Sequence, residues 1–292
     1  MKRRTFTVEK PSRVQAVLRG ALALARDEVF ALVERGAVYV DGRRAKDAAA
    51  RVAAGAKVMV VLEESGEAVT APSPKAAPLV VLYEDSDVLA VDKPPGVTAQ
   101  PTPGKVGDSL VDLATAYLRK QAGLVHRLDR ETSGVTVFGK NPRATSALAA
   151  AFREGRAKKE YLAVTGSGVP SSGVIELPLS KDPSRPGRWR ASDKANGISA
   201  ETHFTRLSDD GAVAVVALFP QTGRTHQLRA HLAGIGYPIV GDRLYGGAEG
   251  PRCLLHAHCL EIKAPGGDDV GRGIDDLSIE APVPPEIARF LT

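Results

Sequence analysis

The chain has 292 residues, more than the usual single domain of about 100–150, so we expect two domains. It carries 39 Lys and Arg against 34 Asp and Glu, a net charge of +5 that suits a polyanionic partner. Two cysteines cannot form a disulfide framework, and we find neither a secretory signal nor an apolar run of 18 residues, so we expect a cytoplasmic protein that does not span a membrane.

Residues 1–64 are expected to form a small domain of two helices and a strand pair. Apolar residues recur there at helical spacing, at Val14, Val17, Leu18, Val29, Leu32 and Val33. The alternating stretch that follows ends in Asp41-Gly42, a pair typical of a hairpin turn. Residues 65–78 are rich in Pro, Ala and Ser and predict a linker. A second domain is then expected over residues 79–292.

The second domain reads as a mixture of strands and helices. Residues 79–97 predict two strands joined by a polar turn at 84–87, and further strands are expected at 135–140, 161–166 and 211–220. A helix is expected at 142–155. Because strands and helices do not alternate strictly, an α+β fold with a mixed, largely antiparallel sheet is favoured over a doubly wound one.

The stretch GLVHRLDRETSGV, residues 123–135, places charged side chains between two apolar edges. Extended chain would direct its side chains to two faces, one with Arg127, Asp129 and Glu131 and the other with His126, Leu128 and Arg130. Flanking arginines would favour the ionised form of the Asp129 carboxyl. A turn is expected at 132–134. A solvated cluster of surface ion pairs is the alternative interpretation.

This stretch resembles the signature of the RluA-type pseudouridine synthases, in which an H-R-L-D-[RK]-[DE]-T-S-G run carries the catalytic aspartate. The resemblance continues in the family's order with VDKPPGV before the run, and with KKEYLAVTG, QTGRTHQLRAHLAGIGYPIVGDRLYGG and CLLHAHCLEI after it. It covers residues 79–265, and residues 1–64 resemble the S4-type RNA-binding module. Glu131, where many relatives have Asp, and the variable loop VTAQPTPGKVGD leave the choice of substrate open.

The resemblance implies a pseudouridine-synthase-like fold with a central cleft, preceded by a small S4-like α/β domain. It implies an isomerase without cofactor or metal, which cleaves the N1–C1′ bond of a uridine in RNA, turns the uracil and rejoins it through C5. Asp129 would act at the ribose, Tyr161 would take the C5 proton, Arg229 would pair with Asp129, and Arg127 would fill the space of the flipped base. The other RNA-binding candidates are His126, Arg130, Arg224, Arg26 and Arg35, and phosphate contacts are also expected from Lys158, Lys159, Arg185, Arg188 and Arg190.

A helix is expected from Thr225 to Ala233, with Thr at its start and Gly234 at its end. Leu228 and Leu232 would face the core. Arg229 lies about 100° from that stripe and could reach into a cleft.

Three other patterns suggest different chemistry. Residues 134–141 nearly match a phosphate-binding loop, but VTVF predicts a strand where a loop of free backbone donors is required, and Asn replaces the magnesium-binding hydroxyl. The residues Cys253, His256, His258 and Cys259 could bind zinc, but a strand would direct the histidines and the cysteines to opposite faces. Asp129 and Glu131 would lie about 6–7 Å apart on a strand, which suits neither glycosidase mechanism.

The sequence therefore predicts a monomeric RNA pseudouridine synthase acting on structured RNA, with 23S ribosomal RNA as the first expectation and transfer RNA as the alternative. An RNA-binding or ribosome-assembly protein without catalysis is the second hypothesis, and a sugar-hydrolysing enzyme is the third. The presence of Asp129, Tyr161 and Arg229 together argues against the second.

Overall fold

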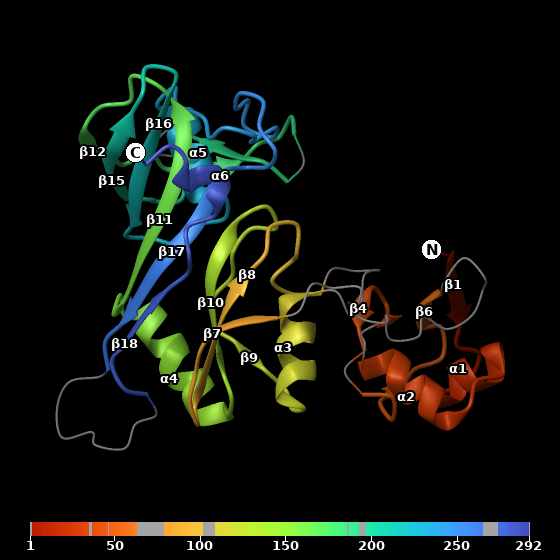
Figure 1. Cartoon of the computed structure of the whole chain (residues 1–292). Coiled ribbons are helices and arrows are strands. Elements are labelled where there is room, and N and C mark those ends of the chain that lie inside the picture. The colour runs from red at the N-terminus through yellow and green to blue at the C-terminus, as the bar shows by residue number, and fades with distance from the viewer. Residues whose placement is uncertain are drawn as a thin grey trace. The chain divides into compact units, whose positions relative to one another are not determined.

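The computed structural model describes residues 2–34, 37–45, 47–62, 79–101, 109–185, 187–192, 197–264 and 274–291 (Figure 1). The chain forms two compact units, Met1–Pro78 with Gln100–Leu113, and Leu79–Ala99 with Ala114–Thr292. The predicted linker at 65–78 lies outside the described residues. No helix within these ranges combines the length and the apolar character needed to cross a bilayer.

The first unit contains the two predicted helices, α1 (Val14–Leu22) and α2 (Arg26–Glu34). Its four-stranded sheet has the order β1-β6-β3-β4, with bounds Lys2–Thr7, Lys57–Leu62, Val38–Val40 and Arg43–Arg44. Strands β2 (Ser12–Arg13) and β5 (Arg51–Val52) form a separate pair. The predicted turn between β3 and β4 is confirmed, because Asp41 and Gly42 both have positive φ, 46° and 77°. Strand β1, which pairs with β6 along its whole length, was not predicted.

The second unit is built on a ten-stranded sheet in the order β12-β15-β16-β11-β17-β10-β8-β7, with β18 beside β17 and β9 beside β10 (Figure 1). The strands are β7 (Val80–Glu84), β8 (Val88–Lys93), β9 (Gly123–Leu124), β10 (Ser133–Gly139), β11 (Ala157–Gly166), β12 (Ser172–Ile175), β15 (Thr202–Asp209), β16 (Val213–Pro220), β17 (Leu255–Ile262) and β18 (Leu277–Glu280). A separate hairpin holds β13 (Leu179–Lys181) and β14 (Trp189–Ala191). Its helices are α4 (Pro142–Arg153), α5 (Gln227–Gly234) and α6 (Pro285–Ala288), and it also contains the second half of α3 (Leu110–Leu118). All pairs in the large sheet are antiparallel except β10 with β17, so the expected α+β fold is confirmed.

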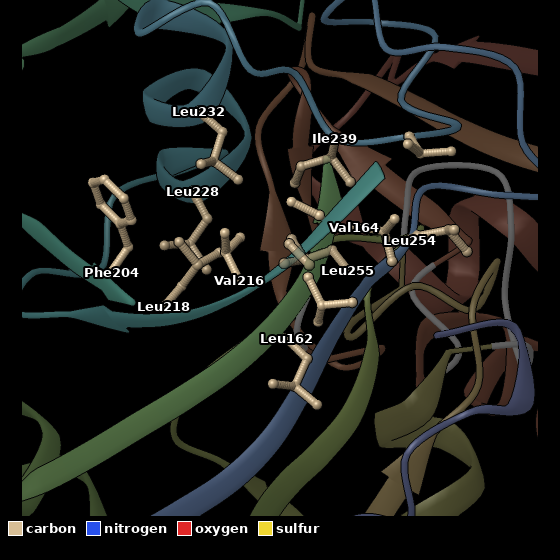
Figure 2. Packing of buried hydrophobic residues seen from close by; sticks show 14 of the residues in the cluster. Leu162, Val164, Phe204, Val216, Leu218, Leu228, Leu232, Ile239, Leu254 and Leu255 are labelled. Carbon is tan, nitrogen blue, oxygen red and sulfur yellow. The ribbon is translucent and has the colours of Figure 1, made fainter. Parts of the chain in front are cut away.

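The main core lies between strands β11, β16 and β17 and helix α5, as Figure 2 shows. Leu162 and Val164 of β11 pack in the same cluster as Val216 of β16, and both faces of these strands are covered. The predicted core stripe of α5 is confirmed, since Leu228 and Leu232 are buried in this cluster. The core therefore fixes the rotation of α5 about its axis, and with it the direction of Arg229.

Strands β10 and β17 run parallel and pair only briefly, Ser133 with His256 and Gly134 with Ala257. On its other side Ala257 pairs with Tyr161 of β11. The start of β10 and the middle of β11 therefore lie on either side of one residue of β17. This junction brings the end of the charged segment 125–132 next to the strand that carries Tyr161.

The extended chain considered for residues 126–131 does not form a strand, because residues 125–129 are irregular and Arg130–Glu131 form a turn. The backbone NH of Thr132 donates to the carbonyl of Asp129 at 3.1 Å, so the turn lies three residues before the predicted one. The carbonyl of Arg130 accepts from the Gly96 NH at 2.8 Å, a contact from outside the segment that its own sequence does not reveal. Residues 133–139 form a buried strand, which supports rejecting the phosphate-loop interpretation.

We expect Gly134→Ala to destabilise the second unit by about 3 kcal/mol or more. Gly134 has φ 113°, and an added Cβ would lie 2.1 Å from the carbonyl oxygen of Ala257. Gly166→Ala in β11 is the matched control, because no heavy atom lies within 4 Å of its Cβ position and its φ is not positive. Urea unfolding measures both, and equal midpoints for the two variants would contradict this account of the junction.

Candidate active site

A cavity of about 580 Å³ lies within the second unit, where the charged segment, α4, β11, α5 and β17 meet. Its lining residues are Val125, His126, Arg127, Leu128, Asp129, Thr132, Ala149, Phe152, Arg153, Lys159, Tyr161, Pro220, Gln221, Thr222, Gly223, Arg224, His226, Gln227, Leu228, Arg229 and Leu255. Arginines and lysines outnumber carboxylates in this lining, in which Asp129 is the acidic residue. A cavity with this balance of charge suits an anionic ligand.

Asp129 pairs with an arginine that is distant in sequence. Nη1 of Arg229 lies 3.5 Å from Oδ2 of Asp129. The other edge of the guanidinium is held by Asp242, whose carboxylate accepts from Nε at 2.6 Å and from Nη2 at 2.8 Å. Arg229 and Asp242 are both buried, whereas the Asp129 side chain is 20% exposed. The Asp242 carboxylate therefore fixes one edge of the guanidinium, and the other edge pairs with Asp129 at the cavity wall.

This arrangement corrects the expected environment of Asp129. Arg127 is exposed, and Nε of Arg130 donates to the carbonyl of Gly96 at 3.0 Å, so the structure records no ion pair between Asp129 and either flanking arginine. Burial alone would lower the pKa of Arg229, but its hydrogen bonds to Asp242 and the nearby carboxylates raise that pKa above its usual value. Arg229 therefore stays a cation.

Asp242 lies in the loop between α5 and β17, and backbone groups of this loop hold its carboxylate. Its Oδ1 accepts from the backbone NH of Leu244 at 3.1 Å and of Tyr245 at 3.3 Å. The ring of Tyr245 lies under the guanidinium of Arg229, with 5.1 Å between ring centroid and Cζ. Asp242 and Tyr245 were not predicted as site residues, although both lie in the segment QTGRTHQLRAHLAGIGYPIVGDRLYGG that carries the resemblance.

The start of α5 differs from the prediction. The helix begins at Gln227 rather than Thr225, and His226 precedes it in the left-handed conformation with φ 55°. His226 Nδ1 lies 3.1 Å from the hydroxyl of Tyr245, and its Nε2 lies 4.0 Å from Oδ2 of Asp129. Burial lowers the pKa of His226, and the Asp129 charge opposes that shift. His226 therefore forms part of the wall beside Asp129.

Tyr161 lines the same cavity from β11. Burial raises the pKa of its hydroxyl above the usual value of 10, and the charge of Asp129 raises it further. Tyr161 therefore keeps its phenolic proton at neutral pH. The structure thus brings Asp129, Tyr161 and Arg229 together around one cavity.

Lys93 anchors the turn that follows Asp129. Its side chain is completely buried, and its ammonium donates to the carbonyls of Pro94 at 2.9 Å, Val97 at 2.8 Å and Arg130 at 3.0 Å. Burial lowers the pKa of Lys93 to about 8, although the charges of Glu131 and Asp129 oppose the shift. Three carbonyl acceptors use all three protons of the ammonium. Sequence reasoning used this segment for a strand prediction and for the resemblance, and missed the role of Lys93 in holding the turn.

The side chain of His126 hydrogen-bonds to and stacks on other parts of the protein. Its Nε2 accepts from the backbone NH of Val137 at 3.0 Å, and its ring stacks on Phe152 at a centroid distance of 4.6 Å. Burial lowers its pKa to about 3, and the charge of Lys159 acts in the same direction. A neutral ring that accepts a backbone hydrogen bond packs the segment against β10. This geometry gives no support to the expected direct contact with RNA.

The other candidate RNA-binding residues lie in separate places. Arg127 and Arg224 line the cavity, and Arg224 also donates from Nε to the carbonyl of Ser199 at 3.0 Å. Arg26 lies in the first unit, with its guanidinium 5.5 Å from the centroid of the Phe30 ring. Arg35 lies outside the described residues. The cavity accordingly explains only part of this set.

The possible zinc ligands have other surroundings. His256 Nδ1 lies 2.9 Å from the hydroxyl of Ser133, and His258 Nδ1 lies 3.0 Å from the carbonyl of Ala281. Within the described part of the chain, no three His, Cys, Asp or Glu side chains are grouped so that they could hold a metal ion. The contact between Ser133 and His256 instead strengthens the junction of β10 with β17.

Comparison with known proteins gives consistent matches. The profile of the RNA pseudouridylate synthase family matches residues 87–234. The dual-specificity RNA pseudouridine synthase RluA of Escherichia coli K12 is 39% identical, over 64% of this chain and 88% of its own length. The ribosomal large subunit pseudouridine synthase D of Borreliella burgdorferi is 31% identical, over 74% of this chain and 69% of its own. The solved structure of human RNA pseudouridylate synthase domain containing 1 superposes with a TM-score of 0.60 and 26% identity, over 72% of this chain and 86% of the human one.

We expect Asp242→Asn to destabilise the second unit by about 3 kcal/mol, because it leaves the buried Arg229 without its fixed counter-charge. The control is Asp276→Asn, which breaks an ion pair with Lys263 whose side chains are 57% and 65% exposed. That control should leave the urea midpoint unchanged within error. Equal effects of the two substitutions would show that Asp242 does not hold Arg229 in the folded state.

We expect His126 to make the free energy of unfolding depend on pH in the acidic range. Its pKa is about 3 in the folded protein and about 6.5 when unfolded, so its contribution is fully present above pH 6.5 and is lost as the pH falls toward 3. Wild type should lose about 2–4 kcal/mol more stability between pH 7 and pH 4 than His126→Gln, whose side chain does not titrate. Urea midpoints at several pH values measure this. Parallel pH dependences for the two proteins would contradict it.

Proposed function

Because the chain belongs to the RluA-type family of RNA pseudouridine synthases, isomerases that act on RNA, we propose that its substrate is 23S ribosomal RNA. The similarity to a ribosomal large subunit pseudouridine synthase supports this choice. Transfer RNA is the alternative substrate, which the similarity to a dual-specificity enzyme supports. The basic lining of the cavity suits either RNA.

The observation that carries the assignment of roles is the ion pair of Asp129 with Arg229 at the wall of the cavity. In this proposal a uridine leaves the RNA stack and enters the cavity, because its glycosidic bond cannot be reached within a helix. The Asp129 carboxylate acts at the ribose while the N1–C1′ bond breaks and positive charge develops at C1′. Arg229, fixed by Asp242, holds that carboxylate in one orientation.

After the uracil turns, C5 bonds to C1′ and must then lose its proton. Tyr161 is our candidate for the group that receives this proton, because it lines the same cavity as Asp129 and no other tyrosine does among the described residues. The raised pKa keeps this hydroxyl protonated at neutral pH, so in this proposal its oxygen accepts the C5 proton while its own phenolic proton passes to the Asp129 carboxylate. The step remains feasible because loss of the C5 proton restores the aromatic ring of the base. Arg127, exposed at the cavity wall, is placed in this proposal in the space left by the flipped nucleotide.

We propose that residues 1–64 form an S4-like RNA-binding module that adds affinity outside the cavity. The exposed side chain of Arg26 and the net positive charge of the chain support this role, and Arg35 is a further candidate. The competing hypothesis of an RNA-binding protein without catalysis is disfavoured by the geometry of Asp129. A bidentate buried pair that directs a cation toward one carboxylate is not needed for binding alone.

Asp129→Asn is expected to lower the rate of pseudouridine formation by at least about 10³-fold and to retain RNA affinity, because the amide preserves shape and loses the charge that acts at the ribose. Carbodiimide mapping of ribosomal and transfer RNA after incubation with each protein measures the product, and filter binding measures affinity. The control is Glu131→Gln, a carboxylate of the same turn that is 43% exposed and pairs with Arg130. Full activity of Asp129→Asn would overturn the proposed mechanism, and release of free uracil would indicate hydrolysis.

A further inference from the structure

Lys159 is a cation of the cavity that the mechanism above does not use. It precedes Tyr161 by two residues on β11, so the two side chains lie on the same face of the strand, and both line the cavity. Its ammonium makes no hydrogen bond or ion pair with any described residue. Lys158, its neighbour, is exposed and does not line the cavity. The strand therefore aims one of two adjacent lysines at the site.

The surroundings of Lys159 leave its charge uncompensated. Burial lowers the pKa of its ammonium, and no carboxylate opposes that shift. Lys93 provides the contrast, since its buried ammonium is satisfied by three carbonyl oxygens. A partly dehydrated cation without a partner is unfavourable in the empty protein and becomes favourable when a ligand supplies a negative charge. The geometry thus favours an anionic group beside Lys159.

There is room for such a group next to the ammonium. Gly223 also lines the cavity, and a Cβ added at Gly223 would have Nζ of Lys159, at 3.9 Å, as its one neighbour within 4 Å among the described residues. The missing side chain leaves that space open. His126, whose pKa is lowered by burial and by the charge of Lys159, is neutral at physiological pH and adds no second positive charge.

We propose that Lys159 binds a phosphate of the RNA backbone inside the cavity, next to the nucleotide that is isomerised. This inference rests on the proposed function, because it takes RNA as the ligand. Uracil carbonyls carry only partial charge, whereas a phosphate oxygen carries the full charge that the ammonium lacks. Lys159 is then a binding residue that fixes the strand, while Asp129, Arg229 and Tyr161 act on the nucleotide.

The test compares the salt dependence of RNA affinity for wild type, Lys159→Gln, Lys159→Arg and Lys120→Gln. Each phosphate contact to single-stranded RNA contributes about 0.7 to the slope of log affinity against log salt. We expect Lys159→Gln to reduce the slope by about this amount and to raise KM about 10-fold with a smaller change in kcat. Lys159→Arg should restore the slope because it keeps the charge. Lys120→Gln removes an equal charge from an exposed side chain outside the cavity and should change the slope less.

A second measurement identifies the phosphate. RNA with a neutral methylphosphonate at the position beside the target uridine should bind wild type more weakly, and Lys159→Gln should show no further loss with it. A slope for Lys159→Gln equal to that of wild type, or additive losses at every methylphosphonate position, would overturn the inference. Affinity is measured separately from isomerisation. An RNA that binds but is not isomerised would therefore count against the proposed function, and the comparison of affinities would still test the role of Lys159. Thermal unfolding of each variant verifies that it is folded.

Discussion

The ion pair between Arg229 and Asp242 is the interaction on which the site depends. Both side chains are buried, and two short hydrogen bonds fix the plane of the guanidinium. Removing two charges from water is costly, and the cost is offset only when geometry and further hydrogen bonds are good. Backbone donors from Leu244 and Tyr245 provide those further bonds to Asp242. The remaining edge of the guanidinium meets Asp129 at the cavity wall, so a catalytic carboxylate is oriented without being enclosed.

The sheet places the two sides of this site next to each other. The brief parallel pairing of β10 with β17 lets Gly134 approach Ala257 more closely than any residue with a side chain could, and Ala257 also pairs with Tyr161. The segment that carries Asp129 ends at this junction. Lys93 closes the turn from the other side through the carbonyl of Arg130. Asp129 is therefore positioned by contacts with three distant parts of the chain.

The cations around the cavity differ in how their charge is satisfied, and the differences indicate their roles. Arg229 has two carboxylates, and Lys93 has three carbonyls. Lys159 is partly dehydrated and has no acceptor among the described residues. A cation whose charge is already compensated maintains the structure of the site, whereas a cation without a partner at the wall of a cavity is stabilised when an anion binds. The same cavity can thus combine a rigid catalytic pair with a position for the RNA backbone.

The sequence by itself determined the features that depend on neighbouring residues. The Asp41–Gly42 turn follows from the conformations those two residues tolerate, the core stripe of α5 follows from helical periodicity, and the motif around Asp129 identified the family. The tertiary structure decided what surrounds Asp129. Segment 126–131 alone suggested its flanking arginines as the partners of Asp129, but the carbonyl of Arg130 accepts from Gly96 and Lys93, and the arginine that pairs with Asp129 comes from position 229. The contact of Asp242 with Arg229 and the open space beside Lys159 were also decided by the tertiary structure, because side-chain charges interact through space and no local pattern encodes which distant residues the packed core brings within a few ångströms.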